Sequence, residues 1–127
     1  MKKIKADDRP VDIRKRTFDF AVRIVRLCNH LFGKPGVSRT LANQLLKAGT
    51  SVGANVEEAQ AGQSRADFIS KNAIALKEAR ETHYWLRLLV ASKVLPESRI
   101  SELRDEAEQL MRIIGSIVVS VRRASAK

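Results

Sequence analysis

The sequence predicts an all-α protein, folded as an antiparallel up-down-up-down four-helix bundle. Four long segments carry apolar residues at intervals of three and four, which is the period of an amphipathic helix. Short polar breaks separate these segments, so consecutive helices are expected to be antiparallel neighbours. The composition, 44% apolar and 30% charged with three Pro and six Gly, is typical of a helical globular domain.

The first helix is expected over residues 13–32. Asp12 precedes it as a plausible side-chain N-cap, and the Gly-Lys-Pro-Gly break at residues 33–36 ends it. Outside one polar stripe, nearly all positions of this helix are apolar, and this apolar face is wider than one neighbouring helix can cover. A polar stripe at helical spacing is formed by Arg16, Asp19, Arg23, Arg26 and His30.

The second helix is expected from about Ser38, whose hydroxyl suits an N-cap, to the polar break at residues 62–64. Gly49 and Gly53 are four residues apart and therefore lie on one face of this helix. Each glycine costs about 1 kcal/mol of helix propensity relative to alanine. Close approach of another helix to this face would offset that cost.

The third and fourth helices follow in the same pattern. The third starts after Ser64, in a Ser-Arg-Ala-Asp run that resembles a capping box, and continues to about Ser92. The fourth is expected over residues 99–122, and its second half, residues 110–121, is apolar nearly all round. Such a helix must be buried on every side, which one chain of 127 residues has too little protein to achieve. The sequence therefore predicts a homo-oligomer.

The chain is expected to form one domain with a short extension at each end. Residues 1–12 are expected to be a flexible basic arm, residues 13–123 the four-helix bundle domain, and residues 124–127 a C-terminal tail. No apolar run reaches the roughly 18 residues that a membrane span requires, and the start of the chain has no signal-peptide core. These features favour a cytoplasmic protein with no membrane partner.

The net charge of +10 is concentrated in the first part of the chain. Residues 1–50 contain twelve Lys and Arg against four Asp and Glu, whereas residues 51–127 contain twelve against ten. This asymmetry favours a surface that binds a polyanion. No aromatic residue is interleaved with the basic residues of the segment 2–16, so phosphate contacts are the expected mechanism. The residues expected to contact nucleic acid are Lys2, Lys3, Lys5, Arg14, Lys15, Arg16, Arg23, Arg26, Arg122 and Arg123.

These basic residues are expected to share one end of the bundle. In an up-down-up-down arrangement, the start of the first helix and the end of the fourth fall at the same end. We therefore expect one basic end that extends along the first helix.

Patterns of catalytic or metal-binding residues are not found in the sequence. His30 and His83 belong to no His-Glu-x-x-His run, and no glycine-rich phosphate loop is present. Cys28, the only cysteine, lies on an apolar face and is expected to be a buried structural thiol. We expect no enzymatic activity, no cofactor and no metal site.

The segment 51–90 resembles the signature of a known family. It contains Ser51-Val-Gly-Ala-Asn55-Val-Glu-Glu58, then an Arg, then a long helix with a Glu. Small bacterial four-helix bundles, first noticed in intervening sequences of large-subunit ribosomal RNA genes, have a similar Ser-x-x-x-Asn-Ile-Ala-Glu-Gly-like segment followed by an Arg and a Phe-rich, Glu-containing helix. The resemblance covers nearly the whole chain and implies a ring-shaped homopentamer. The residues that match the family positions are Asn55, Glu58, Arg65 and Glu81.

These matched residues permit two interpretations. Glu58 and Glu81 on adjacent helices would suit acid–base chemistry or a metal. Alternatively, Arg65 or Arg80 neutralises them and Asn55 ties the helices together in a structural polar network, because buried charges persist when paired. The structural interpretation is favoured, since no nucleophile, histidine pair or phosphate cradle accompanies the carboxylates.

The sequence therefore favours a non-enzymatic basic oligomer that binds nucleic acid, RNA preferred, through phosphate contacts. The run Arg112-Ile-Ile-Gly-Ser-Ile with Val121-Arg-Arg is similar to the ending of accessory proteins of diversity-generating retroelements. Those proteins are basic pentameric bundles that associate with a reverse transcriptase and its template RNA, so this resemblance implies a reverse transcriptase as a candidate partner. The alternative is a protein–protein scaffold with no nucleic-acid role.

Overall fold

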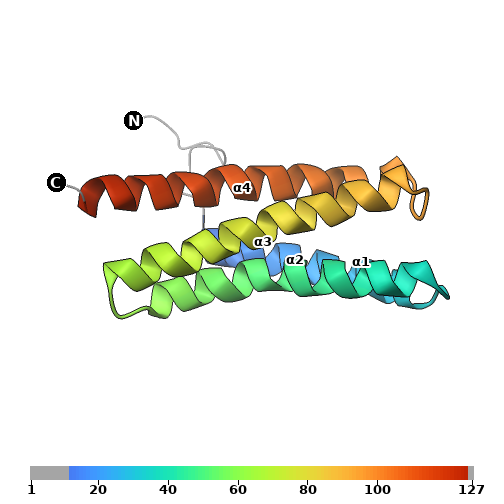
Figure 1. The fold of residues 1–127 in the computed structure, drawn as a ribbon, viewed down its shortest axis with the longest axis horizontal. Helices are drawn as coiled ribbons and strands as arrows, with labels where there is room; N and C mark the ends of the chain where they lie inside the picture. Colours follow the sequence, from blue (N-terminus) through green and yellow to red (C-terminus); the bar gives the residue numbers. More distant parts are fainter. Residues whose placement is uncertain (1–11, 126–127) are drawn as a thin grey trace, which may run out of the picture.

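The computed structural model describes residues 12–125, which form four helices and no strand (Figure 1). The four helices are long, lie side by side and alternate in direction, so the expected all-α four-helix bundle is confirmed. Residues 1–11, with Lys2, Lys3 and Lys5 of the expected basic arm, and residues 126–127 lie outside the described part of the chain. The helices are α1 (Ile13–Phe32), α2 (Val37–Ala61), α3 (Arg65–Ala91) and α4 (Glu97–Ser125).

Side-chain N-caps start α1 and α3, as the sequence predicts. Asp12 Oδ1 accepts a hydrogen bond of 3.2 Å from the backbone N–H of Lys15. Ser64 Oγ accepts one of 3.1 Å from the backbone N–H of Asp67. Each bond satisfies one of the donors that a helix N-terminus otherwise leaves free. The bounds of α1 are those expected from the sequence.

The start of α2 differs from the prediction. The helix begins at Val37, and its N-cap is Gly36, which makes no side-chain capping bond. Gly36 has a φ of 78°, a conformation that glycine adopts without the steric cost that other residues incur. The expectation that Ser38 caps α2 was therefore wrong, because Gly36 turns the chain into the helix and leaves Ser38 in the first turn.

The bounds of α4 are wider than expected at both ends. The helix begins at Glu97, directly after Pro96, rather than near residue 99. It continues through Ser125, so residues 124 and 125 belong to the helix and not to a C-terminal tail. No Gly or Pro, the usual helix stop signals, occurs between Arg122 and Ser125.

The helices do not pack evenly around the bundle. α1 packs chiefly on α2, α2 on α3, and α3 on α4, whereas α1 and α4 approach each other less closely. The core is continuous along these contacts. Its largest side chains with less than 2% exposure include Phe20, Ile24, Leu45, Leu86, Leu110 and Ile114. The bundle is therefore most open between α1 and α4, which are the first and last helices in the chain.

The two glycines of α2 permit close packing against α1. A Cβ atom added at Gly49 would lie 2.7 Å from Cγ2 of Ile24, and one added at Gly53 would lie 3.2 Å from the carbonyl oxygen of Thr17. Both distances are shorter than an ordinary van der Waals contact. The sequence-based explanation of Gly49 and Gly53, a close helix–helix approach, is confirmed.

The apolar second half of α4 is only partly covered. Ile114 and Val118 are buried, and Ile113 and Ile117 are half-buried against the core. Val119 remains 47% exposed. One chain therefore leaves some of this apolar surface open to solvent, and self-association stays a prediction. None of the helices within residues 12–125 has a stretch long and apolar enough to cross a membrane.

The Cys28 thiol is expected to resist alkylation and disulfide exchange in the folded protein. Its side chain is 1% exposed and its Sγ lies 3.5 Å from the carbonyl oxygen of Ala42. Burial disfavours the thiolate and raises the pKa of Cys28 from 9.0 to about 11. At pH 8, a colorimetric disulfide reagent should react slowly with the native protein and at once in denaturant.

The raised pKa of Cys28 also predicts how the stability of the fold depends on pH. The folded state holds the Cys28 proton more tightly than the unfolded state, so this contribution is fully present below pH 9 and is lost as pH rises through about 11. Cys28→Ala should remove that part of the pH dependence. Rapid reaction of native Cys28 at pH 8 would contradict its assignment as a structural thiol.

Candidate nucleic-acid interface

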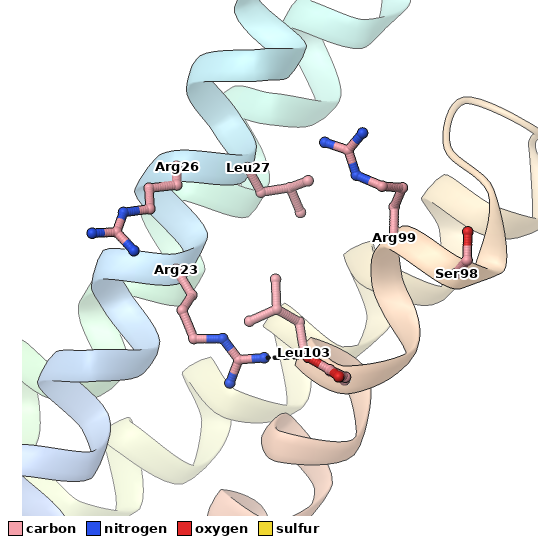
Figure 2. A pocket seen from close by; sticks show the side chains of 7 residues that line it. Arg23, Arg26, Leu27, Ser98, Arg99 and Leu103 are labelled. Atoms are coloured by element: carbon pink, nitrogen blue, oxygen red, sulfur yellow. Dashed lines mark ion pairs between the residues drawn. The ribbon is translucent and has the colours of Figure 1, made fainter.

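The opening between α1 and α4 is a groove of about 270 Å³ (Figure 2). One wall comes from the middle of α1 and the other from the first turns of α4. Three arginines and one carboxylate supply its charge. The lining residues are Arg23, Arg26, Leu27, Ser98, Arg99, Glu102 and Leu103.

Two leucines form the base of this groove. Leu27 and Leu103 are each 7% exposed, and Figure 2 shows them pointing toward each other from α1 and α4. Arg99 projects from the α4 side, and Arg26 extends outward from α1 at the rim. The groove therefore combines an apolar floor with cationic edges. This arrangement suits a ligand whose anionic groups can reach the arginines at the edges.

Within the part of the chain that the structure describes, the charge of the groove is only weakly neutralised. Arg23 Nη2 lies 3.8 Å from Glu102 Oε2, and the Glu102 side chain is 92% exposed. Exposed ion pairs of this kind are worth about 0–1 kcal/mol, so Arg23 can exchange this partner for another anion. Within residues 12–125, no carboxylate lies within ion-pair distance of Arg26 or Arg99. Three guanidinium groups thus face one carboxylate.

Arg16 is held by α4 and is not free to bind phosphate. Its Nε donates to Glu106 Oε2 at 2.8 Å, and its Nη2 donates to Glu106 Oε1 and to Gln109 Oε1, each at 2.6 Å. The hydrogen bonds to Glu106 raise the pKa of Arg16, against the opposing effect of burial. The expectation that Arg16 contacts nucleic acid is therefore corrected, because this residue joins α1 to α4 beside the groove.

The other predicted basic residues that the structure describes do not gather at one end of the bundle. Arg14 is exposed near the start of α1, and the Lys15 ammonium is paired with Asp19 at 2.8 Å. Arg122 lies sixteen residues beyond Glu106, the partner of Arg16, which places it about 24 Å farther along α4. Arg122 and Arg123 instead line a second groove between α3 and α4. Within residues 12–125, Arg14 and Lys15 therefore do not join Arg122 and Arg123 in the single basic end expected from the sequence, and Lys2, Lys3 and Lys5 lie outside the described residues.

The structure separates Glu81 from Asn55 and Glu58, three of the four residues that match the family signature. Asn55 Nδ2 donates to the carbonyl oxygen of Ser51 at 2.8 Å, a bond within α2 that does not tie the helices together. Glu58 and Arg65 are exposed, near the turn between α2 and α3. Counting back from that turn, Glu81 lies about 20 Å farther along the hairpin than Glu58.

Glu81 instead lies beside another carboxylate of α3. The pKa of Glu78 is raised first by burial and then by the charge of Glu81. Glu58 and Glu81 therefore do not meet as a catalytic or metal-binding pair, and their expected joint role with Asn55 is corrected. Within residues 12–125, no group of three or more His, Cys, Asp or Glu side chains is placed to hold a metal ion.

Sequence reasoning missed Arg99, Arg80 and Arg112. Arg99 contributes to the α1–α4 groove, and Arg80 and Arg112 contribute to the α3–α4 groove. The excess of Lys and Arg is greatest in the first fifty residues, so local charge density does not point to these three arginines. The helical periodicity of α4 contains a signal for the α1–α4 groove, because Arg99, Leu103 and Glu106 share one face of that helix.

The fold and its grooves define a small basic four-helix bundle in which helix packing leaves arginine-lined surfaces exposed. A sequence profile of the 23S rRNA-intervening sequence protein family matches residues 9–116. The chain belongs to this family.

A solved structure supports this assignment. The chain is similar to a protein of unknown function from the S23 ribosomal protein family of Bacteroides thetaiotaomicron, with 39% sequence identity and a TM-score of 0.78. The match covers 84% of this chain and 97% of that one. No match was found among curated proteins.

Proposed function

We propose that this protein binds nucleic acid, RNA in preference to DNA, and that it does so without catalysing a reaction. The observation that carries the proposal is the α1–α4 groove, in which Arg23, Arg26 and Arg99 face a single carboxylate, Glu102, among the residues that the structure describes. The family name links its members to intervening sequences of 23S rRNA. We extend that association to this chain as the reason to favour RNA.

Phosphate is the chemical group that the groove suits best. A guanidinium group forms paired, charge-assisted hydrogen bonds with phosphate oxygens, and these are stronger than bonds between neutral groups. The floor made by Leu27 and Leu103 keeps water from one side of a bound phosphate. Lower local polarity strengthens the attraction between opposite charges. Contacts of this kind carry no base information, so binding is expected to depend on salt more than on sequence.

In the fuller form of this proposal, several chains assemble and present their grooves together. A homopentamer would place five copies of the α1–α4 groove on one particle, and avidity would raise its affinity for a long RNA. Such a particle would serve as an accessory to an enzyme that uses RNA as template, with a reverse transcriptase as the candidate partner. The alternative function is a protein–protein scaffold, and the exposed Phe18 side chain favours this second candidate.

Removal of the groove arginines is expected to weaken binding and flatten its salt dependence. Fluorescence anisotropy with a labelled 20-nucleotide RNA, at several salt concentrations, compares wild type with the variant Arg23→Gln/Arg26→Gln/Arg99→Gln. Each phosphate contact to a single strand contributes about 0.7 to the slope of log K against log salt, so the slope should fall by about 2. The same measurement with DNA of equal length tests the preference for RNA.

A charge-matched control separates the groove from net charge. Arg39, Lys47 and Lys93 are exposed and line neither groove. The triple change of these residues to Gln removes the same three positive charges and should retain most of the affinity. Equal loss in both triple variants would show that binding follows net charge and not the groove. Absence of any binding by the wild type at low salt would reject the proposal in favour of the scaffold.

A further inference from the structure

A second basic groove lies between α3 and the second half of α4. Its volume is about 800 Å³. Four arginines line it: Arg80 from α3, and Arg112, Arg122 and Arg123 from α4. All four side chains are exposed, and within residues 12–125 no carboxylate lies within ion-pair distance of any of them. The groove therefore holds a large positive charge that the described residues leave unpaired.

One carboxylate lies at the edge of this surface. Glu108 lines a pocket together with Arg80 and Arg112. Its Oε1 atom is 3.0 Å from Nε2 of His83 on α3, and this contact directs the carboxylate toward the histidine. Four arginines against this one carboxylate leave the surface complementary to a polyanion.

An exposed aromatic ring lies one helical turn along α3 from Arg80. Tyr84 is 49% exposed and lies four residues after Arg80, so both share one face of α3. Cζ of Arg87 lies 5.8 Å from the centroid of the Tyr84 ring, and the ring packs edge-on against Trp85 with centroids 5.1 Å apart. Aromatic rings held beside arginines form the stacking platforms on which proteins bind the bases of single strands. The α1–α4 groove has no aromatic residue in its lining.

Gly115 leaves the floor of the α3–α4 groove open. A Cβ atom added there would meet only Cδ2 of Leu76, at 3.9 Å, which is an ordinary contact. Packing within the chain therefore does not require glycine at this position, in contrast to Gly49. A glycine inside a helix nevertheless costs about 1 kcal/mol relative to alanine. Glycine here leaves the helix backbone open to close approach from outside the chain.

The two grooves lie on opposite sides of α4. Arg99 and Gly115 are sixteen residues apart, which corresponds to about 160° around the helix axis and about 24 Å along it. A segment of a few nucleotides bound in one groove cannot at the same time occupy the other. Each groove therefore has room for its own segment.

We propose that the α3–α4 groove binds a single-stranded segment of nucleic acid, with phosphates on its arginines and a base on Tyr84, so that each chain holds two segments. This inference rests on the proposed function, in which the α1–α4 groove holds the first segment. Two bound segments per chain would make the protein a bridge between strands, or between distant parts of one RNA.

Calorimetric titration with a hexauridylate at low salt tests the number of sites per chain, and this number does not depend on how many chains assemble. Wild type is expected to bind two hexanucleotides per chain. The variant Arg80→Gln/Tyr84→Leu/Arg112→Gln should bind one, and so should the α1–α4 variant Arg23→Gln/Arg26→Gln/Arg99→Gln. Quenching of Trp85, the only tryptophan, should be lost in the first variant and kept in the second.

A variant without a change of charge tests the groove itself. Gly115→Leu fills the floor and should reduce the number of sites from two to one, whereas Ala66→Leu, at an exposed α3 position outside both grooves, should leave two. Circular dichroism should show that both variants are folded. Two sites in Gly115→Leu or in the α3–α4 triple variant would overturn the inference.

The outcomes distinguish this inference from the proposed function. One site in wild type, removed by the α1–α4 changes and untouched by the α3–α4 changes, rejects the second groove and leaves the proposed function intact. One site in wild type that is removed by the α3–α4 changes and untouched by the α1–α4 changes rejects the first groove alone. Competition by a polyglutamate peptide at equal charge concentration, with the same loss in the α3–α4 variant, would assign this groove to an acidic protein and reject nucleic acid as its occupant.

Discussion

Replacement of Gly49 by leucine is expected to lower the free energy of unfolding by about 3 kcal/mol, the upper part of the usual range for overpacked cores. The new Cβ atom would lie 2.7 Å and 2.8 Å from Cγ2 and Cγ1 of Ile24. Ile24 is fully buried, and its branched side chain has few alternative rotamers, so it cannot move aside. The helices α1 and α2 would have to separate. Urea denaturation followed by circular dichroism measures the change.

The same substitution at Gly115 is the matched control. Gly115 also lies inside a helix, but a Cβ atom there meets only the end of Leu76, at 3.9 Å. Leucine should raise the free energy of unfolding by up to about 1 kcal/mol, because it has a higher helix propensity than glycine. Similar destabilisation at both positions would contradict the assignment of Gly49 as a packing residue and Gly115 as an open one.

The features that the sequence predicted correctly depend on local spacing. The caps at Asp12 and Ser64 join residues three apart in the chain, and the face shared by Gly49 and Gly53 follows from helix geometry alone. Four helices and their order follow from the same kind of signal. The start of α2 was harder to predict, because it depends on a positive φ at Gly36 that no side-chain pattern reveals.

The grooves depend on contacts between distant segments. The polar stripe of α1 was found from the sequence, and two of its members, Arg23 and Arg26, do line the α1–α4 groove. Arg16 belongs to the same stripe but is neutralised by Glu106, which lies 90 residues away in the chain. Which arginines are neutralised is set by the register of α4 against α1, and a single sequence does not contain that register.

The separation of Arg122 and Arg123 from the start of α1 has a similar cause. The topology was predicted correctly, and it does place both helix ends on the same side of the bundle. α4 has 29 residues and α1 has 20, so α4 extends well beyond the level at which Arg16 contacts it. Helix length and register together move these arginines onto the α3–α4 surface, where they meet Arg80.

Self-association is expected to give a particle several times heavier than the 14.2 kDa chain, and five times heavier in a homopentamer. Phe18 is 62% exposed on α1, beside a surface pocket of about 360 Å³ that also includes Ala21 and Gly53. A large aromatic side chain next to an apolar pocket is typical of the centre of a protein interface. Phe18 therefore provides apolar surface that one chain leaves uncovered, away from both arginine-lined grooves.

The variant Phe18→Gln tests this surface without disturbing the core, because the wild-type side chain is mostly in solvent. Light scattering after size-exclusion chromatography at micromolar concentration should give 14.2 kDa for this variant and a multiple of it for wild type. Val37→Gln is the control, since Val37 is 68% exposed but does not line the pocket, and this variant should remain assembled. A wild-type mass of one chain over this concentration range would contradict the predicted oligomer. The gain in RNA affinity from several grooves on one particle would then be absent, whereas the groove of each chain could still bind.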